Sequence, residues 1–498
     1  MPAQFVAPPP HAVAGTPAAG VTPPAISGRW WALAVVVAAQ FMFVVDAFIV
    51  NVAIPSIRAD LHATPAEIEA VIAAYQITYA TTVITGGRLG DIAGRRRVFV
   101  GGVLAFTAAS LWCALAGSGA ELALARMAQG ITAAMMVPQV LATIHTLFPG
   151  AGRPRAFAVF GVALGLGGAV GFALGGWLVT LDLFGLGWRS VFLVNLPLGA
   201  AIALAALRVM PEAARRPGIR LDLPGAAALF LALACLIGPV MAGRELGWPW
   251  WLWAVIASGG IVLALFLRLE QAVERRGGLP LIDLALLGDR AFLHGLGAAF
   301  SFQLGNVSFY LVVTLFTQGE LGFSPLRAGL TVVPLALAFT LASQLAGRWT
   351  ARGGILVLLW GCVVQFTGIV ALGALAAFVR EPDTELLMEA LTVFGFGQGM
   401  VMAPLAGVVL ATVQPGHAGS GAGLLNTVQQ SAGALGVSLI GAAYFLGGGS
   451  DRRGVLAAIA MLGLSVLATG GVLALMKRAE QSCSGRTGIS ALSDQKLR

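Results

Sequence analysis

The sequence predicts an all-α membrane protein with fourteen spanning segments, and three observations lead to this fold class. Of the 498 residues, 58% are apolar and only 10% are charged, which is too little charge for the surface of a soluble protein. Apolar stretches of about 20 residues, each long enough to cross a bilayer, follow one another along the chain. Most of the 30 Lys and Arg residues fall in every second connection, the asymmetry that orients membrane helices.

The expected spans share high apolar content and short polar connections. They cover roughly residues 30–52, 67–87, 98–118, 122–144, 155–180, 189–209, 222–243, 248–268, 291–316, 326–347, 354–378, 386–411, 420–446 and 454–476. Because the basic connections follow the even-numbered spans, we expect a multi-pass protein of the cell (cytoplasmic) membrane with both termini in the cytoplasm.

The chain is expected to form two six-helix bundles with two extra central helices between them. A weak internal repeat supports this division, because Gly347 to Gly354 resembles the glycine- and arginine-rich connection at 87–97. The expected units are a disordered cytoplasmic tail at 1–28, a first bundle at 29–210, two linker helices at 211–270, a second bundle at 271–478 and a second disordered tail at 479–498.

The connection between the second and third spans carries three glycines and five charges in eleven residues. Glycine allows a tight turn and close approach of two backbones, and the arginines are expected to keep this connection in the cytoplasm. Asp91 can pair with a neighbouring arginine or interact with a helix N-terminus.

Asp46 and Arg126 are the clearest ionisable residues inside predicted spans. Both lie about one or two helical turns below the outer surface, so an ion pair between them is geometrically possible. Charged groups inside a membrane are costly and usually functional. Asp46 could load and release a proton, or the two residues could form a static ion pair that fixes helix packing.

The span 155–180 contains small residues at helical spacing, including Gly167, Gly171, Gly175 and Gly176. Glycines in this pattern let helices pack with their backbones nearly in contact. They predict either ordinary close packing or a seam that slides or bends where the two bundles meet.

Several polar and aromatic side chains inside the spans are candidates for lining a central substrate cavity, with ordinary packing as the alternative for each. The selected candidates are Gln40, Phe43, Gln129, Gln303 and Asn306.

Other chemistry is disfavoured by the sequence. The four cysteines and five histidines are scattered and show no metal-ligand or disulfide spacing, so no metal is expected. The sequence contains no phosphate-binding GxxxxGK[ST] loop, so we do not expect ATP to be the energy source. The net charge is +8, but the basic residues lie mostly in the connections between spans rather than in one patch. We therefore expect no nucleic-acid partner.

From about residue 30 to 478, the chain resembles the fourteen-helix drug:proton antiporters of the major facilitator superfamily. The residues 87–97 match the family's signature connection almost completely. Further matches are the first-span pattern from Asp46 to Pro55, the fourth-span run from Leu122 to Gly130, the sixth-span run from Trp188 to Gly199 and the Asp222 to Gly225 turn.

This resemblance implies a proton-coupled secondary transporter that exports small amphipathic organic compounds, such as drugs, antibiotics or secondary metabolites, by alternating access. Its partners would be the substrate, protons and the lipid bilayer, with the proton motive force in place of any cofactor. The resemblance also implies that Arg126 takes part in proton coupling and that a motif in the signature connection closes the cytoplasmic gate. That motif comprises Gly87, Arg88, Gly90, Asp91, Gly94, Arg95 and Arg96.

Three positions depart from the family pattern. Phe172 replaces the proline that usually follows Gly171, Phe48 replaces a threonine, and Ala70 lies where a tryptophan is common. Loss of the proline removes an expected kink. Uptake or facilitated diffusion of a specific metabolite is therefore the alternative function. A membrane-embedded enzyme or a non-transporting scaffold is a distant alternative, because no convergent catalytic set is visible.

Overall fold

The computed structural model describes residues 28–148, 152–212, 221–276, 280–281, 284–379, 382–413, 418–446 and 452–495, and these residues form helices and short connections. The predicted tail at 1–28 lies almost entirely outside the described residues. Counting α6 and α7, which are separated only at Val194, as one helix, the described chain contains fourteen long helices, one in each predicted segment.

The first half comprises α1 (Arg29–Leu61), α2 (Pro65–Ala93), α3 (Arg95–Leu115), α4 (Gly119–Leu147), α5 (Arg153–Leu181), α6 (Ser190–Leu193) and α7 (Asn195–Val209). Two further helices follow, α8 (Leu223–Leu246) and α9 (Trp250–Arg275). The second half comprises α10 (Arg290–Thr314), α11 (Pro325–Gly353), α12 (Ile355–Phe378), α13 (Thr384–Ala411), α14 (Ala418–Leu446) and α15 (Arg452–Gln495). Short 3₁₀ or π segments are η2 (Leu183–Gly185), η3 (Gly187–Arg189), η4 (Leu284–Gly288) and η5 (Leu315–Glu320).

Local sequence signals explain several helix starts. Thr64 and Glu67 form a reciprocal capping box at the start of α2, where Pro65 occupies the first helical position. The Ser118 side chain accepts a hydrogen bond from the backbone of α4, and Asp289 does the same for α10. Gly94 separates α2 from α3 with a φ of 102°, a conformation that favours glycine.

Twelve described helices are long and apolar enough to cross a membrane, and α2 and α14 are not among them. These two helices pack against each other inside the bundle, and some of their polar residues lie in that contact. The Thr427 hydroxyl of α14 donates to the Ala80 carbonyl of α2 at 3.2 Å. A Cβ on Gly433 would lie 2.3 Å from Oε1 of Gln76.

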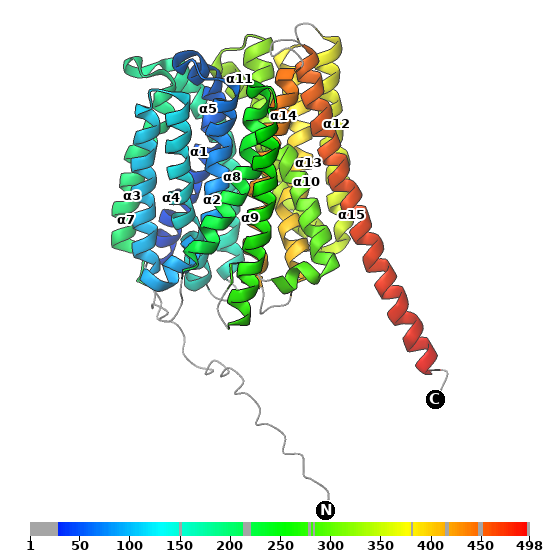
Figure 1. Cartoon of the computed structure of the whole chain (residues 1–498). Helices are drawn as coiled ribbons and strands as arrows, with labels where there is room; N and C mark the ends of the chain where they lie inside the picture. The colour runs from blue at the N-terminus through cyan, green and yellow to red at the C-terminus, as the bar shows by residue number, and fades with distance from the viewer. Residues whose placement is uncertain are drawn as a thin grey trace, which may run out of the picture.

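Figure 1 shows the two halves side by side, with α8 and α9 in front of the seam between them. The halves meet where α5 packs on α11 and where α2 packs on α14, while α8 contacts both α2 and α14. We name the end of the bundle that carries the α2–α3 turn and the α9–α10 connection the basic end, after Arg95, Arg96, Arg275 and Arg276.

The last helix extends further than the apolar pattern indicates. We expected a disordered tail from residue 479, whereas α15 continues to Gln495. No proline interrupts the chain between residues 452 and 495, so nothing in the covalent backbone forces an earlier end. In Figure 1 this end of α15 extends beyond the other helices.

Candidate functional site

Asp46 of α1 and Arg126 of α4 form an ion pair in the interior of the first half. The Arg126 Nη1 lies 2.6 Å from Oδ2 of Asp46, and the two residues are 1% and 0% exposed. The predicted equal depth of the two residues is therefore matched by a direct contact. A buried charge pair of this kind depends on both partners, because removal of one leaves the other charge without compensation.

Three further polar groups complete the contacts of this pair. The Asp46 Oδ1 accepts hydrogen bonds from the side-chain amides of Gln129 at 3.1 Å and Asn195 at 2.8 Å. Both amides also donate to the Ser110 hydroxyl, at 2.8 and 3.2 Å. The network therefore joins α1, α3, α4 and α7, so a change at Asp46 reaches most of the first half.

Arg126 has additional contacts that hold its guanidinium in place. Its Nη1 also donates to Oε1 of Gln129 at 2.7 Å, and its Nε donates to the Val71 carbonyl at 3.3 Å. The guanidinium carbon lies 4.1 Å from the centre of the Tyr75 ring, a cation–π contact. The Arg126 guanidinium is thus held by contacts with α2 and α4 as well as by its ion pair with Asp46.

Ser110 and Asn195 belong to this network although sequence analysis did not select them as site residues. Ser110 is fully buried in α3, and a serine inside a helix is common without any functional role. Asn195 offered a better signal, since an amide two residues before Pro197 is unusual in an apolar segment, and the structure buries it at the start of α7.

The five cavity candidates fall into separate groups. Gln129 belongs to the Asp46 network, and Gln40 and Phe43 lie on α1 of the same half. The Phe43 ring lies 6.1 Å from the ring of Tyr75. The Gln40 Oε1 is buried and has no hydrogen-bond partner among the described residues.

The other two cavity candidates lie across the seam on α10. The Asn306 amide donates to Gln303 at 3.5 Å and its oxygen accepts from Gln398 of α13. Gln398 in turn contacts the Tyr310 hydroxyl at 3.1 Å. The candidates are therefore distributed over both halves, and no hydrogen bond among the described residues joins the α1 group to the α10 group.

The two aromatic departures from the family pattern contact each other. The rings of Phe48 and Phe172 lie 5.7 Å apart, and both pack on Tyr310 of α10, at 4.8 and 5.3 Å. This cluster joins α1 and α5 of the first half to the second half. Two phenylalanines thus stand where the family has a threonine and a proline, and both form an aromatic contact with the second half.

The glycines of α5 form two rows, and only one of them faces the second half. Cβ atoms on Gly167, Gly171 and Gly175 would lie within 3.0 Å of α1, in the same half. A Cβ on Gly176 would lie 2.4 Å from the Pro325 carbonyl oxygen of α11. Of the two alternatives that the sequence left open, Gly167, Gly171 and Gly175 show close packing within one half, whereas Gly176 lies between the halves, because the helical period turns it onto another face.

Two further glycines close the seam between α5 and α11. A Cβ on Gly165 would lie 2.1 Å from the Thr340 hydroxyl, and one on Gly329 would lie 2.4 Å from the Phe172 carbonyl oxygen. The two helices therefore approach at backbone distance along much of their length, as small residues permit.

The signature connection forms a compact charged turn at the basic end. Arg95 contacts Asp91 at 3.2 Å and also donates to the Thr146 hydroxyl of α4 at 2.8 Å. Arg96 pairs with Glu212 at 2.9 Å. The predicted pairing of Asp91 with a neighbouring arginine is thus present.

Arg88 connects this turn to the central helices. Its guanidinium donates to the Pro280 carbonyl and interacts electrostatically with Asp222, just before α8, and Glu270 of α9. The Asp222 Oδ1 also accepts a hydrogen bond from the Gly225 backbone at 2.9 Å. The motif is therefore in contact with the linker helices as well as with the first half.

Within the motif, Gly90 and Gly87 are expected to respond differently to alanine. A Cβ on Gly90 would lie 2.0 Å from Oε1 of the buried Gln139, whose amide donates to the Gly86 carbonyl at 2.9 Å. We expect Gly90→Ala to lower the thermal unfolding temperature by several degrees, because it displaces this amide. Gly87→Ala is the matched control, since its Cβ would be 3.7 Å from the nearest atom. Equal unfolding temperatures for both variants would contradict this packing.

No group of three or more metal-ligating side chains gathers within the described part of the chain. The sequence profile of the Major Facilitator Superfamily matches residues 36–226 and 223–437.

Curated relatives match along most of the chain. A "Probable actinorhodin transporter" of Streptomyces coelicolor is 38% identical over 431 residues, covering 85% of this chain and 74% of that protein. A puromycin resistance protein of Streptomyces alboniger is 36% identical, covering 83% and 81% of the two chains. The cephamycin export protein CmcT of Amycolatopsis lactamdurans is 35% identical, covering 82% and 84%.

A solved structure shows the same fold. The human organic anion transporter MFSD10 superposes with a TM-score of 0.60 at 19% identity, covering 89% of this chain and 99% of that one. The expected superfamily is confirmed by the profile and the relatives, and it is a family of transporters rather than of enzymes. This chain belongs to the Major Facilitator Superfamily.

Proposed function

We propose that this protein is a proton-coupled efflux transporter that exports small amphipathic organic compounds across the cytoplasmic membrane by alternating access. The buried Asp46–Arg126 ion pair carries the proposal, because an intramembrane acid of this kind is a functional group by default. Relatives whose names refer to antibiotic export or resistance support the direction of transport and the compound class.

The proposed orientation places the basic end in the cytoplasm, with fourteen spans and both termini inside. The arginines of the α2–α3 turn and of the end of α9 support this orientation. The polar composition of α2 and α14 does not prevent them from spanning, because each packs against the other rather than facing lipid on all sides.

In the proposed cycle, Asp46 exchanges protons with the outer side and the cytoplasm in turn. A proton can bind its Oδ2 only when Arg126 moves away, since Nη1 of Arg126 now lies 2.6 Å from that atom. Protonation removes the attraction between the two residues and so changes how α1 packs on α4. Substrate that binds from the cytoplasm favours the deprotonated, paired state, and the proton leaves inward.

The proposed conformational change uses contacts at the two ends of the bundle. The α5–α11 contact at Gly176 and Gly329 and the Phe48–Phe172–Tyr310 cluster lie towards the end opposite the basic end. The charged turn around Asp91 lies at the basic end. We propose that the α5–α11 contact and the aromatic cluster open when substrate leaves to the outside. The charged turn opens when substrate enters from the cytoplasm.

Between these two ends, we propose that the substrate path is lined from both halves. Gln40 and Phe43 would line it from α1, and Gln303 and Asn306 would line it from α10. Gln129 would act in the proton network instead, because its amide oxygen and its amide nitrogen both form hydrogen bonds within the Asp46 network.

Efflux from cells that express the chain tests this function. Cells loaded with a fluorescent lipophilic cation should lose it several-fold faster than cells without the protein, and a protonophore should abolish the difference. Faster accumulation in expressing cells would reject export and support the uptake alternative. Efflux that persists after collapse of the proton gradient would reject proton coupling.

A further inference from the structure

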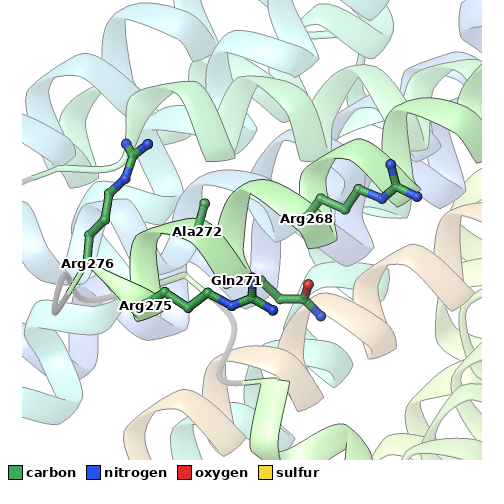
Figure 2. Close-up of a pocket in the computed structure, with 5 residues that line it drawn as sticks. All are labelled: Arg268, Gln271, Ala272, Arg275 and Arg276. Carbon is green, nitrogen blue, oxygen red and sulfur yellow. The ribbon is translucent and has the colours of Figure 1, made fainter.

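The end of α9 carries a pocket with an unusual concentration of positive charge. The pocket has a volume of about 410 Å³ and is lined by Arg268, Gln271, Ala272, Arg275 and Arg276. These positions are three, four, seven and eight residues apart and therefore share one helix face. Figure 2 shows the three arginines spread along the last turns of the helix, with Gln271 beside Arg275.

Within the part of the chain that the structure describes, the three arginines have no acidic partner. All three are exposed, and none of them takes part in an ion pair with another described residue. Glu274, an exposed acid on the same helix, forms no ion pair with these arginines among the described residues. A face with three uncompensated guanidinium groups favours an anion, and guanidinium groups match phosphate oxygens in geometry.

An exposed apolar row leads directly to this pocket. Ile261, Leu265 and Leu269 are 61%, 51% and 50% exposed and lie at four-residue intervals on α9. At the opposite end of the helix, exposed Trp250 and Trp253 are the residue type that marks a membrane interface. The helix thus offers lipid an apolar surface that ends in a basic pocket at the membrane boundary.

We propose that this pocket binds the phosphate headgroup of an anionic phospholipid, whose acyl chains lie along Ile261, Leu265 and Leu269. A soluble phosphate compound would use the arginines but would leave the apolar row unused. This inference rests on the placement of α9 in the membrane and does not depend on proton coupling or on the transported compound.

The site has a structural link to the signature turn. Glu270 lies on the buried face of the same helical turn as Arg268 and Gln271 and interacts electrostatically with Arg88. A lipid that orders the end of α9 therefore also holds Glu270 near the residue that connects α2 to the linker helices. We expect lipid at this site to stabilise the packing of α9 on α8, which in turn packs on α2.

The test measures lipid binding by purified full-length protein. Native mass spectrometry in detergent, with added phosphatidylglycerol or phosphatidylcholine, should show preferential retention of phosphatidylglycerol. The double variant R268Q/R275Q should bind phosphatidylglycerol roughly thirtyfold more weakly, because each arginine near a membrane surface contributes about fivefold. Phosphatidylglycerol should raise the unfolding temperature of the wild type more than that of this variant.

R348Q/R352Q is the matched control, because it removes two exposed arginines from α11 at the same end of the bundle. It should retain wild-type binding of phosphatidylglycerol. Equal losses in both double variants would overturn the site, as would equal retention of the two lipids by the wild type. Stabilisation by soluble glycerol phosphate equal to that by the lipid would show a free-anion site and would also overturn the proposal.

Discussion

Gly176→Ala is expected to reduce transport at least tenfold while the protein still reaches the membrane. The added Cβ would lie 2.4 Å from the Pro325 carbonyl oxygen and 2.9 Å from Cα of Leu326. These are backbone atoms of the first turn of α11, so no side-chain rotation relieves the contact. The halves must then stay further apart at this end. The free energy of the state in which α5 and α11 are in contact there therefore rises.

Gly168→Ala provides the matched control on the same helix. Its Cβ would lie 3.7 Å from the nearest atom of Phe48, which is ordinary van der Waals contact. Efflux rates are compared after correction for the amount of protein in the membrane. Gly329→Ala, which approaches the same seam from α11, should match Gly176→Ala. Similar rates for Gly176→Ala and Gly168→Ala would refute the role of this seam.

Arg126→Ala is expected to cause the largest loss of stability, about 3–5 kcal/mol in the free energy of unfolding, because it leaves the buried Asp46 carboxylate without its positive partner. Denaturant titration of the purified protein in mixed micelles measures this loss. Transport should be abolished as well.

The neutral pair Asp46→Asn/Arg126→Gln separates the structural role of the ion pair from its functional role. It should recover most of the stability that Arg126→Ala loses, because no buried charge remains unpaired. It should not recover proton-driven transport. A double variant that transports at the wild-type rate would show that the ion pair serves packing alone.

The ion pair shows how far sequence reasoning reaches in this protein. Asp46 and Arg126 were predicted to lie at similar depth, since helix rise converts residue number into depth. Ser110 and Asn195 were missed, because depth does not reveal which helices are neighbours or which side of each helix faces inward. Those facts depend on tertiary packing of four helices.

The glycines of α5 show a similar limit. Their spacing correctly predicts close packing, but Gly167 and Gly171 contact α1 whereas Gly176 contacts α11. Sequence periodicity separates faces of one helix without naming the partner of each face. Phe48 and Phe172 were recognised as isolated departures from a family pattern. Only the fold shows that they pack together against Tyr310.

Proton movement in liposomes tests the central claim most directly. Purified protein is reconstituted with a pH-sensitive dye inside, and a gradient of a transported lipophilic cation is applied. The wild type should move protons only when substrate is present, and Asp46→Asn should move none. Asp60→Asn, which alters an exposed carboxylate on the same helix that pairs with Arg189, should retain proton movement. Substrate-dependent proton movement by Asp46→Asn at the wild-type rate would contradict the account.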